Sequence, residues 1–273
     1  MMMTFNSLIR NKFQIHPFHI VEPSPWPLLT SMALLSFTFS GVLYFHTISN
    51  GGILFFLSFI VVFISIILWF RDVSIEGSYL GEHTFAVQKG LIIGISLFIL
   101  SELIFFFGIF WAFFHSALAP TVELGNSWPP AGIETINPFA IPLLNTALLL
   151  SSGATITYSH HGLINGDRYS SILGALLTVI LAVFFTSLQG FEYLQAPFTI
   201  ADGVYGSLFY FSTLIHGIHV VVGTIFITIG LFRIINYQLT DHHHMGFESS
   251  ILYWHFVDVV WLFLYITVYW WGS

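Results

Sequence analysis

The chain has 273 residues, of which 56% are hydrophobic and only 7% are charged, and its formal net charge is −7. Charged residues fill about a quarter of the positions in soluble domains, so this composition excludes an ordinary soluble protein and indicates an integral membrane protein. The chain has no cysteine, which excludes disulfides, thiolate metal sites and iron–sulfur clusters. It has no basic patch, and we expect no nucleic-acid partner.

Four long stretches of the sequence contain no Asp, Glu, Lys or Arg. They lie between Glu22 and Arg71, between Glu134 and Asp167, between Arg168 and Glu192, and between Asp202 and Arg233. Each is long enough to cross the roughly 30 Å hydrocarbon core of a bilayer. Apolar residues also lie all round the expected helices, which is typical of membrane spans. The sequence therefore predicts an all-α, polytopic membrane protein with seven transmembrane helices, at residues 27–45, 52–70, 85–119, 141–160, 169–195, 204–235 and 245–269.

Prolines and polar residues separate these helices. The segment PSPWPLL at 23–29 predicts an extended approach to the first helix, because each proline disfavours helix in the preceding residue. A polar segment at 72–83 separates the second and third helices, and a long loop with several prolines follows the third. The basic N-terminus lacks the apolar core of a signal peptide, so we expect a short mature tail there.

All six basic residues fall on one side of the expected membrane topology. Basic residues mark the side that is not translocated, so this side is expected to be the cytoplasm of a bacterium or the matrix of an organelle. The N-terminus would lie on the same side, and the C-terminus would lie on the opposite side. The six residues are Arg10, Lys12, Arg71, Lys89, Arg168 and Arg233.

Glu102 lies near the middle of the third expected helix, 85–119. An ionised glutamate at bilayer depth costs roughly 2.5 kcal/mol or more, so this side chain should be protonated, paired, or turned toward water or lipid headgroups. Two interpretations stay open on the residues alone. Glu102 is either a functional carboxyl or a neutral side chain that only hydrogen-bonds to a neighbouring helix.

The thirteen histidines invite a metal hypothesis, since imidazole is a frequent ligand of haem, copper and non-haem iron. Membrane desaturases and hydroxylases use HxxxH and HxxHH boxes, and neither pattern occurs in the sequence. We therefore favour helix capping and hydrogen bonds within the bundle, and we expect no metal site. His255 and Asp258 are expected to form a buried hydrogen-bonded pair. The other candidates are His160, His161, His216, His219 and the run 242–244.

A second group of polar residues lies on the basic side of the expected topology. Cationic side chains beside tryptophan at a helix end suit a phospholipid phosphate. The same charges could instead only set the membrane topology. The residues alone favour neither phospholipid binding nor this simpler role. The group comprises Trp69, Arg71, Glu76, His83, Lys89 and Arg233.

Many short motifs follow one another along nearly the whole chain. Residues 101–133 read SELIFFFGIFWAFFHSALAPTVELGNSWPPAGI, and the last helix contains GFESSILYWHFVDVVWLFLY. In the order of these motifs the chain resembles subunit III of the haem-copper cytochrome c oxidases. The resemblance implies a single membrane domain over 1–273, with a tail at 1–25 and a V-shaped, lipid-filled cleft between helices 1–2 (26–76) and helices 3–7 (84–273). The other motifs are PSPWPLL, HTFAVQKG, PLLNT, GDR, APFTIADGVYGS and HGIHV.

The resemblance also implies a function. Subunits of this family are non-catalytic, pack against catalytic subunit I and other oxidase subunits, bind structural phospholipids and support proton uptake. Haem a, haem a3 and copper belong to the partner subunits, so this chain is expected to have no catalytic residue and no cofactor besides phospholipid. Glu102 matches the intramembrane carboxyl of the family that reacts with carbodiimide. The expected lipid-binding residues are Trp69, Arg71, Glu76, His83 and Arg233.

Two positions depart from animal members of the family, which carry arginine at Ile75 and histidine at Glu82. Headgroup binding is therefore expected to rely more on Arg71 or Arg233, or to select a different lipid. A composition rich in Phe and Ile favours the mitochondrial inner membrane over the alternative, a bacterial plasma membrane. Two other functions remain open, namely a membrane-bound metalloenzyme with His boxes and a proton channel that uses Glu102.

Overall fold

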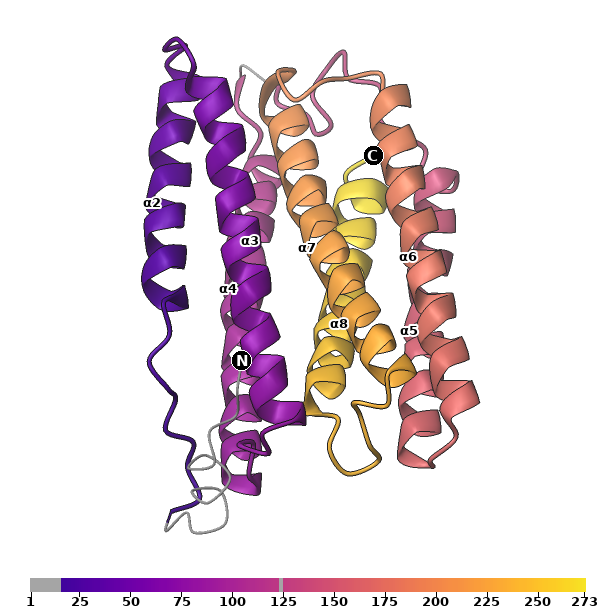
Figure 1. Cartoon of the computed structure of the whole chain (residues 1–273). Coiled ribbons are helices and arrows are strands. Elements are labelled where there is room, and N and C mark those ends of the chain that lie inside the picture. The colour runs from indigo at the N-terminus through magenta and orange to yellow at the C-terminus, as the bar shows by residue number, and fades with distance from the viewer. Residues whose placement is uncertain (1–15, 123–124) are drawn as a thin grey trace. The chain divides into compact units, whose positions relative to one another are not determined.

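A computed structural model describes residues 16–122 and 125–273 of the chain (Figure 1). These residues form α-helices and one π-helical segment, and the described part contains no β-strand, which confirms the all-α prediction. The first 15 residues, including Arg10 and Lys12 of the predicted tail, lie outside the described residues. The elements are α2 (Trp26–Phe45), α3 (Gly51–Ser78), α4 (Phe85–Leu118), α5 (Ile141–Ile164), α6 (Arg168–Gln195), α7 (Gly203–Ile235), α8 (Met245–Leu264) and η2 (Tyr265–Trp271).

Among the described residues, six helical segments are long and apolar enough to cross a membrane. These are α2, α3, α4, α6, α7 and the continuous helix formed by α8 and η2. The remaining helix, α5, has 24 residues, but its many serines, threonines and histidines lower its mean hydropathy. Several of these polar residues, such as Asn145, Ser152 and Ser159, are fully buried. The polar residues of α5 therefore face neighbouring helices.

The helix bounds differ from the predicted spans mainly at the end of α3. The span was predicted to end at residue 70, with a polar segment at 72–83, whereas α3 continues to Ser78. At 1.5 Å per residue its 28 residues extend about 42 Å, which exceeds the roughly 30 Å apolar core of a bilayer. Hydropathy marks where a helix leaves the apolar core, and the helix itself continues into the polar zone.

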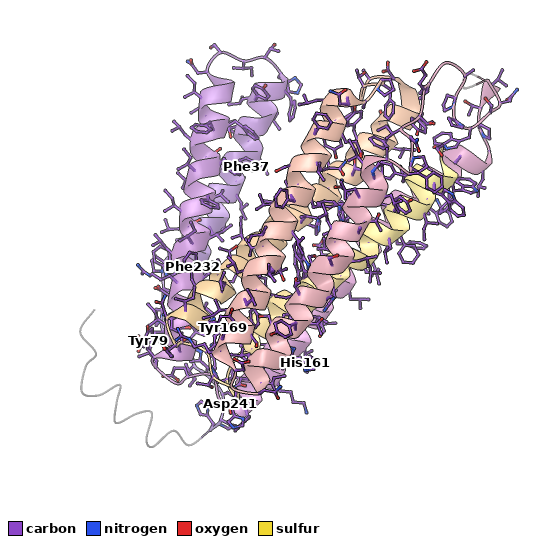
Figure 2. All side chains as sticks on the ribbon, turned by 90° about the vertical axis from the view of Figure 1, so that its right-hand side faces the viewer. Phe37, Tyr79, His161, Tyr169, Phe232 and Asp241 are labelled. Carbon is purple, nitrogen blue, oxygen red and sulfur yellow. The ribbon has the colours of Figure 1, made fainter. Side chains whose placement is uncertain are left out.

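The chain divides into two compact units, Met1–Leu91 and Ile92–Ser273, with the division inside α4. In the first unit α2 and α3 form a helical hairpin. The hydroxyls of Ser40 and Ser58 lie 2.8 Å apart between these helices. Phe37, labelled in Figure 2, stacks on Phe55 with ring centroids 4.7 Å apart. The turn between the helices includes Asn50 in the left-handed conformation, with φ at 65°.

The N-terminal segment of the first unit is tied to the end of α3 and to the start of α4. Trp26 donates its indole N–H to Oδ2 of Asp72 at 2.5 Å. The hydroxyl of Thr84 donates to the carbonyl oxygen of Pro17. Residues 18–24 are not helical, but the stretch predicted to be extended, 23–29, is helical from Trp26 onward. These hydrogen bonds fix the extended segment against the polar end of the hairpin.

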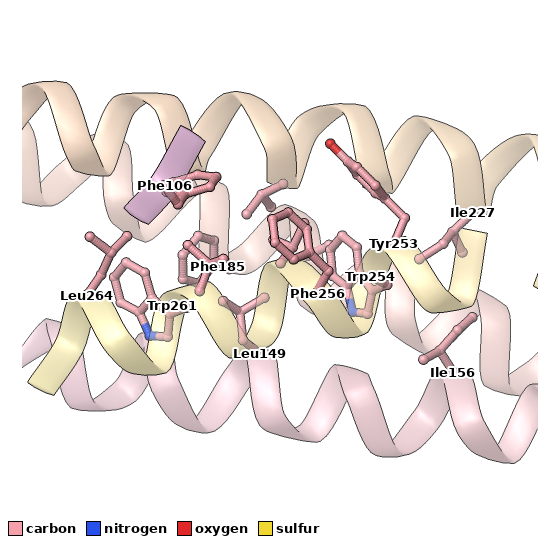
Figure 3. Close-up of a cluster of buried hydrophobic side chains, with 14 of the residues drawn as sticks. Phe106, Leu149, Ile156, Phe185, Ile227, Tyr253, Trp254, Phe256, Trp261 and Leu264 are labelled. Carbon is pink, nitrogen blue, oxygen red and sulfur yellow. The ribbon is translucent and has the colours of Figure 1, made fainter. Parts of the chain in front are cut away.

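In the second unit α8 packs against both α5 and α7, and α6 packs against α5 and α7. Two tryptophans of α8 belong to the buried core that Figure 3 shows. Trp254 donates its N–H to Oγ of Ser152 at 2.9 Å, and Trp261 donates to Oγ1 of Thr146 at 3.0 Å. Two of the buried hydroxyls of α5 thus accept the indole N–H groups, which would otherwise be costly to bury.

A glycine allows α5 and α6 to approach closely. A Cβ atom added to Gly174 of α6 would lie 2.7 Å from the carbonyl oxygen of Thr155 and 2.8 Å from the backbone nitrogen of Ser159. Small residues at helix contacts are typical of membrane proteins, because there is little hydrophobic driving force between helices in lipid and close packing replaces it. The contact between these two helices therefore depends on the missing side chain.

Candidate functional site

The intramembrane carboxyl predicted from the sequence has a partner on another helix. Oε2 of Glu102, on α4, lies 2.9 Å from Nε2 of His219, on α7. The two side chains keep exposed fractions of 23% and 14%. Phe106 approaches the His219 ring edge-on and Tyr253 stacks on it, with centroid distances of 5.1 and 6.2 Å. The carboxyl is thus paired with an imidazole that aromatic rings hold in place, in keeping with the cost of leaving a carboxylate unpaired in the membrane.

The tautomer of His219 follows from its second hydrogen bond. Nδ1 lies 2.8 Å from the carbonyl oxygen of Ile215. A carbonyl oxygen only accepts, so Nδ1 carries a proton and Nε2 is the atom that meets Glu102. The hydrogen bond to the Ile215 carbonyl therefore orients the His219 ring toward Glu102.

The neighbouring histidine has a structural role. His216 is 1% exposed, and its Nε2 lies 3.2 Å from the carbonyl oxygen of Val257. Its ring packs against Phe185 and Trp261 at 5.8 and 5.2 Å. The prediction that His216 and His219 hydrogen-bond within the bundle is confirmed. The sequence did not reveal that the partner of His219 is Glu102.

His255 and Asp258 lie within ion-pair distance, but the predicted hydrogen bond between them is absent. Nδ1 of His255 lies 4.0 Å from Oδ2 of Asp258, which is beyond hydrogen-bond distance. Nε2 of His255 instead lies 3.3 Å from the hydroxyl of Thr157 on α5. The Asp258 carboxylate lies against Gly153, where an added Cβ would be 2.6 Å from Oδ2. The glycine therefore makes room for the carboxylate on the α5 side of α8.

In the first unit, part of the predicted lipid-binding set gathers near the end of α3. The Arg71 side chain is 56% exposed, and its Nε and Nη2 donate to Oδ1 of Asp72 at 3.1 and 2.8 Å. The other oxygen of Asp72 accepts the indole N–H of Trp26. Trp69 is also partly exposed, one turn before these residues. This end of α3 thus presents a guanidinium beside aromatic side chains.

Glu76 and His83, also predicted to bind lipid, are joined by a histidine that the sequence analysis missed. One ligand atom each of His19, Glu76 and His83 lies within 4.8 Å of the other two, and all three residues are partly buried. The rings of His19 and His83 meet edge-on at 6.3 Å. His19 belongs to the extended N-terminal segment, so helical spacing gave no signal for its position. These residue types could hold a metal cation.

Arg233, the last residue of the predicted set, belongs to the second unit. It lies in the last turn of α7, where a cation is favoured by the helix dipole. A Cβ added to Gly246, at the start of α8, would lie 3.0 Å from Nη1 of Arg233. Arg168 lies at the same end of this unit, with its guanidinium donating to Ile235 and covering the Tyr237 ring at 3.4 Å. Figure 2 shows His161, Tyr169, Phe232 and Asp241 at this end as well.

Comparison with known proteins agrees with this architecture. The family model described as Cytochrome c oxidase subunit III matches residues 16–273. Cytochrome c oxidase subunit 3 of Mycosarcoma maydis is 61% identical over 271 residues, covering 97% of this chain and 98% of that relative. The proteins of the same name from Rhizopus stolonifer and Neurospora crassa are 62% and 60% identical, covering 97% and 98% of this chain and 94% and 99% of their own lengths. The chain therefore belongs to the cytochrome c oxidase subunit III family and is a membrane-embedded subunit of the oxidase complex.

Proposed function

We propose that this subunit is a non-catalytic scaffold that binds structural phospholipids and stabilises the catalytic subunit I during electron transfer and proton pumping. The observation that carries the proposal is the exposed guanidinium of Arg71, which shares Asp72 with the indole of Trp26 where α3 leaves its apolar run, with Trp69 one turn before Asp72. A guanidinium makes charge-assisted hydrogen bonds to phosphate, and tryptophan favours the headgroup level of a bilayer. This combination suits a phospholipid held at the membrane boundary.

The charges around Glu76 indicate how a headgroup would be oriented. Glu22, Asp72 and Glu82 all lie close enough to Glu76 to interact with it electrostatically. This negative surrounding disfavours a phosphate next to Glu76. We therefore assign phosphate contacts within the first unit to Arg71 and, independently, phosphate contacts within the second unit to Arg233. Trp69, Glu76 and His83 would contact other headgroup or glycerol atoms, and Glu76 suits an ammonium or hydroxyl group.

The proposed location is the mitochondrial inner membrane, with the N-terminus in the matrix and the C-terminus in the intermembrane space. Support comes from the basic residues in each unit. Arg168 donates to the carbonyl oxygen of Ile235, so the start of α6 and the end of α7, with Arg233, lie at one end of the second unit. Basic residues gathered at one end favour the untranslocated side.

Glu102 is proposed to be the carboxyl of this family that reacts with carbodiimide. A hydrophobic carbodiimide enters apolar surroundings, where a carboxyl group gives its proton to a carbodiimide nitrogen and adds through oxygen to the central carbon. Glu102 is accessible on about a quarter of its side-chain surface, lies in a membrane-spanning helix and is hydrogen-bonded to His219. These three properties are expected of a carboxyl group that reacts with a carbodiimide inside the membrane.

The lipid-binding proposal is tested on the intact oxidase complex with Arg71→Gln and Arg233→Gln. Phospholipids that remain after detergent washing are quantified by mass spectrometry and normalised to haem content. Both variants are expected to retain less phospholipid and to inactivate after fewer turnovers, while the initial rate stays close to that of the unmodified complex. Lys89→Gln is the matched control, because it removes an exposed positive charge of α4 that lies outside the proposed set. Equal phospholipid retention in all three variants would overturn the proposal.

A further inference from the structure

We infer that His19, Glu76 and His83 form a binding site for a divalent transition-metal cation of the Zn²⁺ class. The site lies entirely within the first unit and comprises two imidazoles and one carboxylate. It does not depend on the proposed phospholipid-binding role, although Glu76 and His83 take part in both. From the sequence we expected no metal site and did not single out His19, so the inference adds a metal ligand set to this subunit.

The distances are close to those of a metal site without its ion. The three candidate ligand atoms lie within 4.8 Å of one another. In a tetrahedral zinc site with bonds of about 2.1 Å, ligand atoms are separated by about 3.4 Å. Small rotations of the His19 and His83 side chains would bring the ligand atoms to the shorter separation that a zinc site requires. A fourth position would stay open to water or to a phosphate oxygen.

Several hydrogen bonds hold the three ligands in place. Thr84 donates to the carbonyl of Pro17, which ties the segment that carries His19 to the start of α4. Gln88 donates to the carbonyl of His83 at 2.8 Å. The backbone N–H of Glu82 donates to the carbonyl of Glu76 at 3.2 Å, which closes the turn between the two ligands. The three ligands are therefore brought together by contacts other than the metal.

Gly77 is a further part of the site. A Cβ atom at this position would lie 2.7 Å from Nδ1 and 2.9 Å from Cε1 of His83. Only glycine lets the His83 ring lie this close to the last turn of α3. The ring is thereby held next to Glu76, which precedes Gly77 in the same turn.

The chemistry of the cluster selects the class of cation. Two imidazoles and a carboxylate suit Zn²⁺ and similar borderline cations, whereas Ca²⁺ and Mg²⁺ prefer oxygen ligands alone. Glu22, Asp72 and Glu82 add negative charge around Glu76. This field raises the local concentration of cations, and a divalent ion would relieve the repulsion among the carboxylates.

Zinc titration of the intact oxidase complex tests the inference. The complex is stripped with a chelator and then titrated with Zn²⁺ against a fluorescent zinc indicator, with haem content as the measure of assembly. We expect one zinc equivalent whose affinity falls about 10-fold or more in His19→Gln and in His83→Gln. His16→Gln is the matched control, since His16 is an exposed histidine of the same segment and lies outside the cluster. Identical zinc binding in all four complexes would overturn the inference.

A second measurement needs no variant. Diethylpyrocarbonate modifies accessible imidazoles, and bound Zn²⁺ should protect His19 and His83 but leave His16 reactive, as read by peptide mass spectrometry. Equal modification with and without Zn²⁺ would also overturn the inference. Phospholipid content measured in the same samples separates the zinc proposal from the phospholipid proposal. A variant that loses zinc binding but keeps normal phospholipid content has lost the metal site alone.

Discussion

Glu102 and His219 are 117 residues apart in the chain, and their side chains meet at 2.9 Å inside the membrane-spanning helices. The hydrogen bond joins α4 to α7 within the second unit. A lone carboxyl group at this depth would be costly, and the hydrogen bond with Nε2 of His219 offsets part of that cost. The pairing explains how the longest apolar helix of the chain carries an acidic residue near its middle.

The first prediction concerns Glu102→Gln. The glutamine amide can donate to Nε2 of His219, so the contact between α4 and α7 is retained. We expect normal haem content and at most a modest change in the initial turnover rate of the complex. Modification of this helix by carbodiimide should disappear, as checked by peptide mass spectrometry. Loss of haem in this variant would contradict a purely supporting role for Glu102.

The second prediction separates the hydrogen bond from the carboxyl chemistry. His219→Leu leaves Glu102 without the described partner and should destabilise the subunit by about 1–3 kcal/mol, seen as a lower temperature of thermal inactivation. Ser101→Ala is a suitable control, because Ser101 lies next to Glu102 and its hydroxyl donates only to the carbonyl of Phe98 in its own helix. Equal stability of both variants would show that the pair contributes nothing to the fold.

The pattern of apolar residues was sufficient to predict the helices, because membrane spans are defined by composition over many residues. It was not sufficient for the partners of polar residues. The spacing of His216 and His219 shows that they share a helix face, but the contact from His219 to Glu102 depends on how α4 packs against α7. His19 lies outside the helices, so helical spacing could not indicate that it approaches His83. Only the three-dimensional structure shows this contact.

The pair of His255 and Asp258 shows a second limit of local spacing. Residues three apart on a helix lie on one face, which is why a hydrogen bond was expected. The structure instead turns Asp258 toward Gly153 and His255 toward Thr157, so each side chain follows a feature of α5. A glycine on another helix decided the direction of the carboxylate, and no pattern within α8 could have indicated this.

The third prediction tests the close contact of α5 and α6. Gly174→Ala places a methyl group 2.7 Å from the carbonyl oxygen of Thr155, so the helices must separate. Overpacking of this kind costs about 1–3 kcal/mol, and we expect faster thermal inactivation of the complex. Gly190→Ala lies on the same helix with no neighbouring atom within 4 Å of the added Cβ, and should have little effect. A stable Gly174→Ala complex would contradict the described contact.

The fourth prediction concerns the indole of Trp254. Ser152→Ala removes the acceptor of its N–H and leaves that donor buried without the described partner, at a cost of about 1–3 kcal/mol. Ser151→Ala is the control, because Ser151 is exposed and its hydroxyl donates only to the carbonyl of Ala147. Thermal inactivation of the two complexes is compared. The prediction fails if both variants lose the same stability.

The fifth prediction is a pH dependence at the start of α6. Asp167 is the N-cap of this helix, where its Oδ1 accepts from the backbone N–H of Ser170 and its Oδ2 accepts from the Ser170 hydroxyl. These hydrogen bonds, led by the one from the hydroxyl, lower the pKa of the exposed Asp167 carboxyl below its usual value. The charged carboxylate therefore stabilises the folded subunit at every pH above the pKa of an unfolded aspartate. This contribution is lost as the pH falls through the lowered pKa.

Asp167→Asn isolates the titration of this cap. Asparagine also caps helices well, so the variant should fold normally near neutral pH, whereas Asp167→Ala should be less stable there. Below the usual pKa range of aspartate, the unmodified complex should lose stability relative to Asp167→Asn, because only the carboxylate becomes protonated. The measurement is the rate of thermal inactivation from neutral to acidic pH. A constant ratio of rates between the unmodified complex and Asp167→Asn over this range would mean that the cap does not titrate with folding.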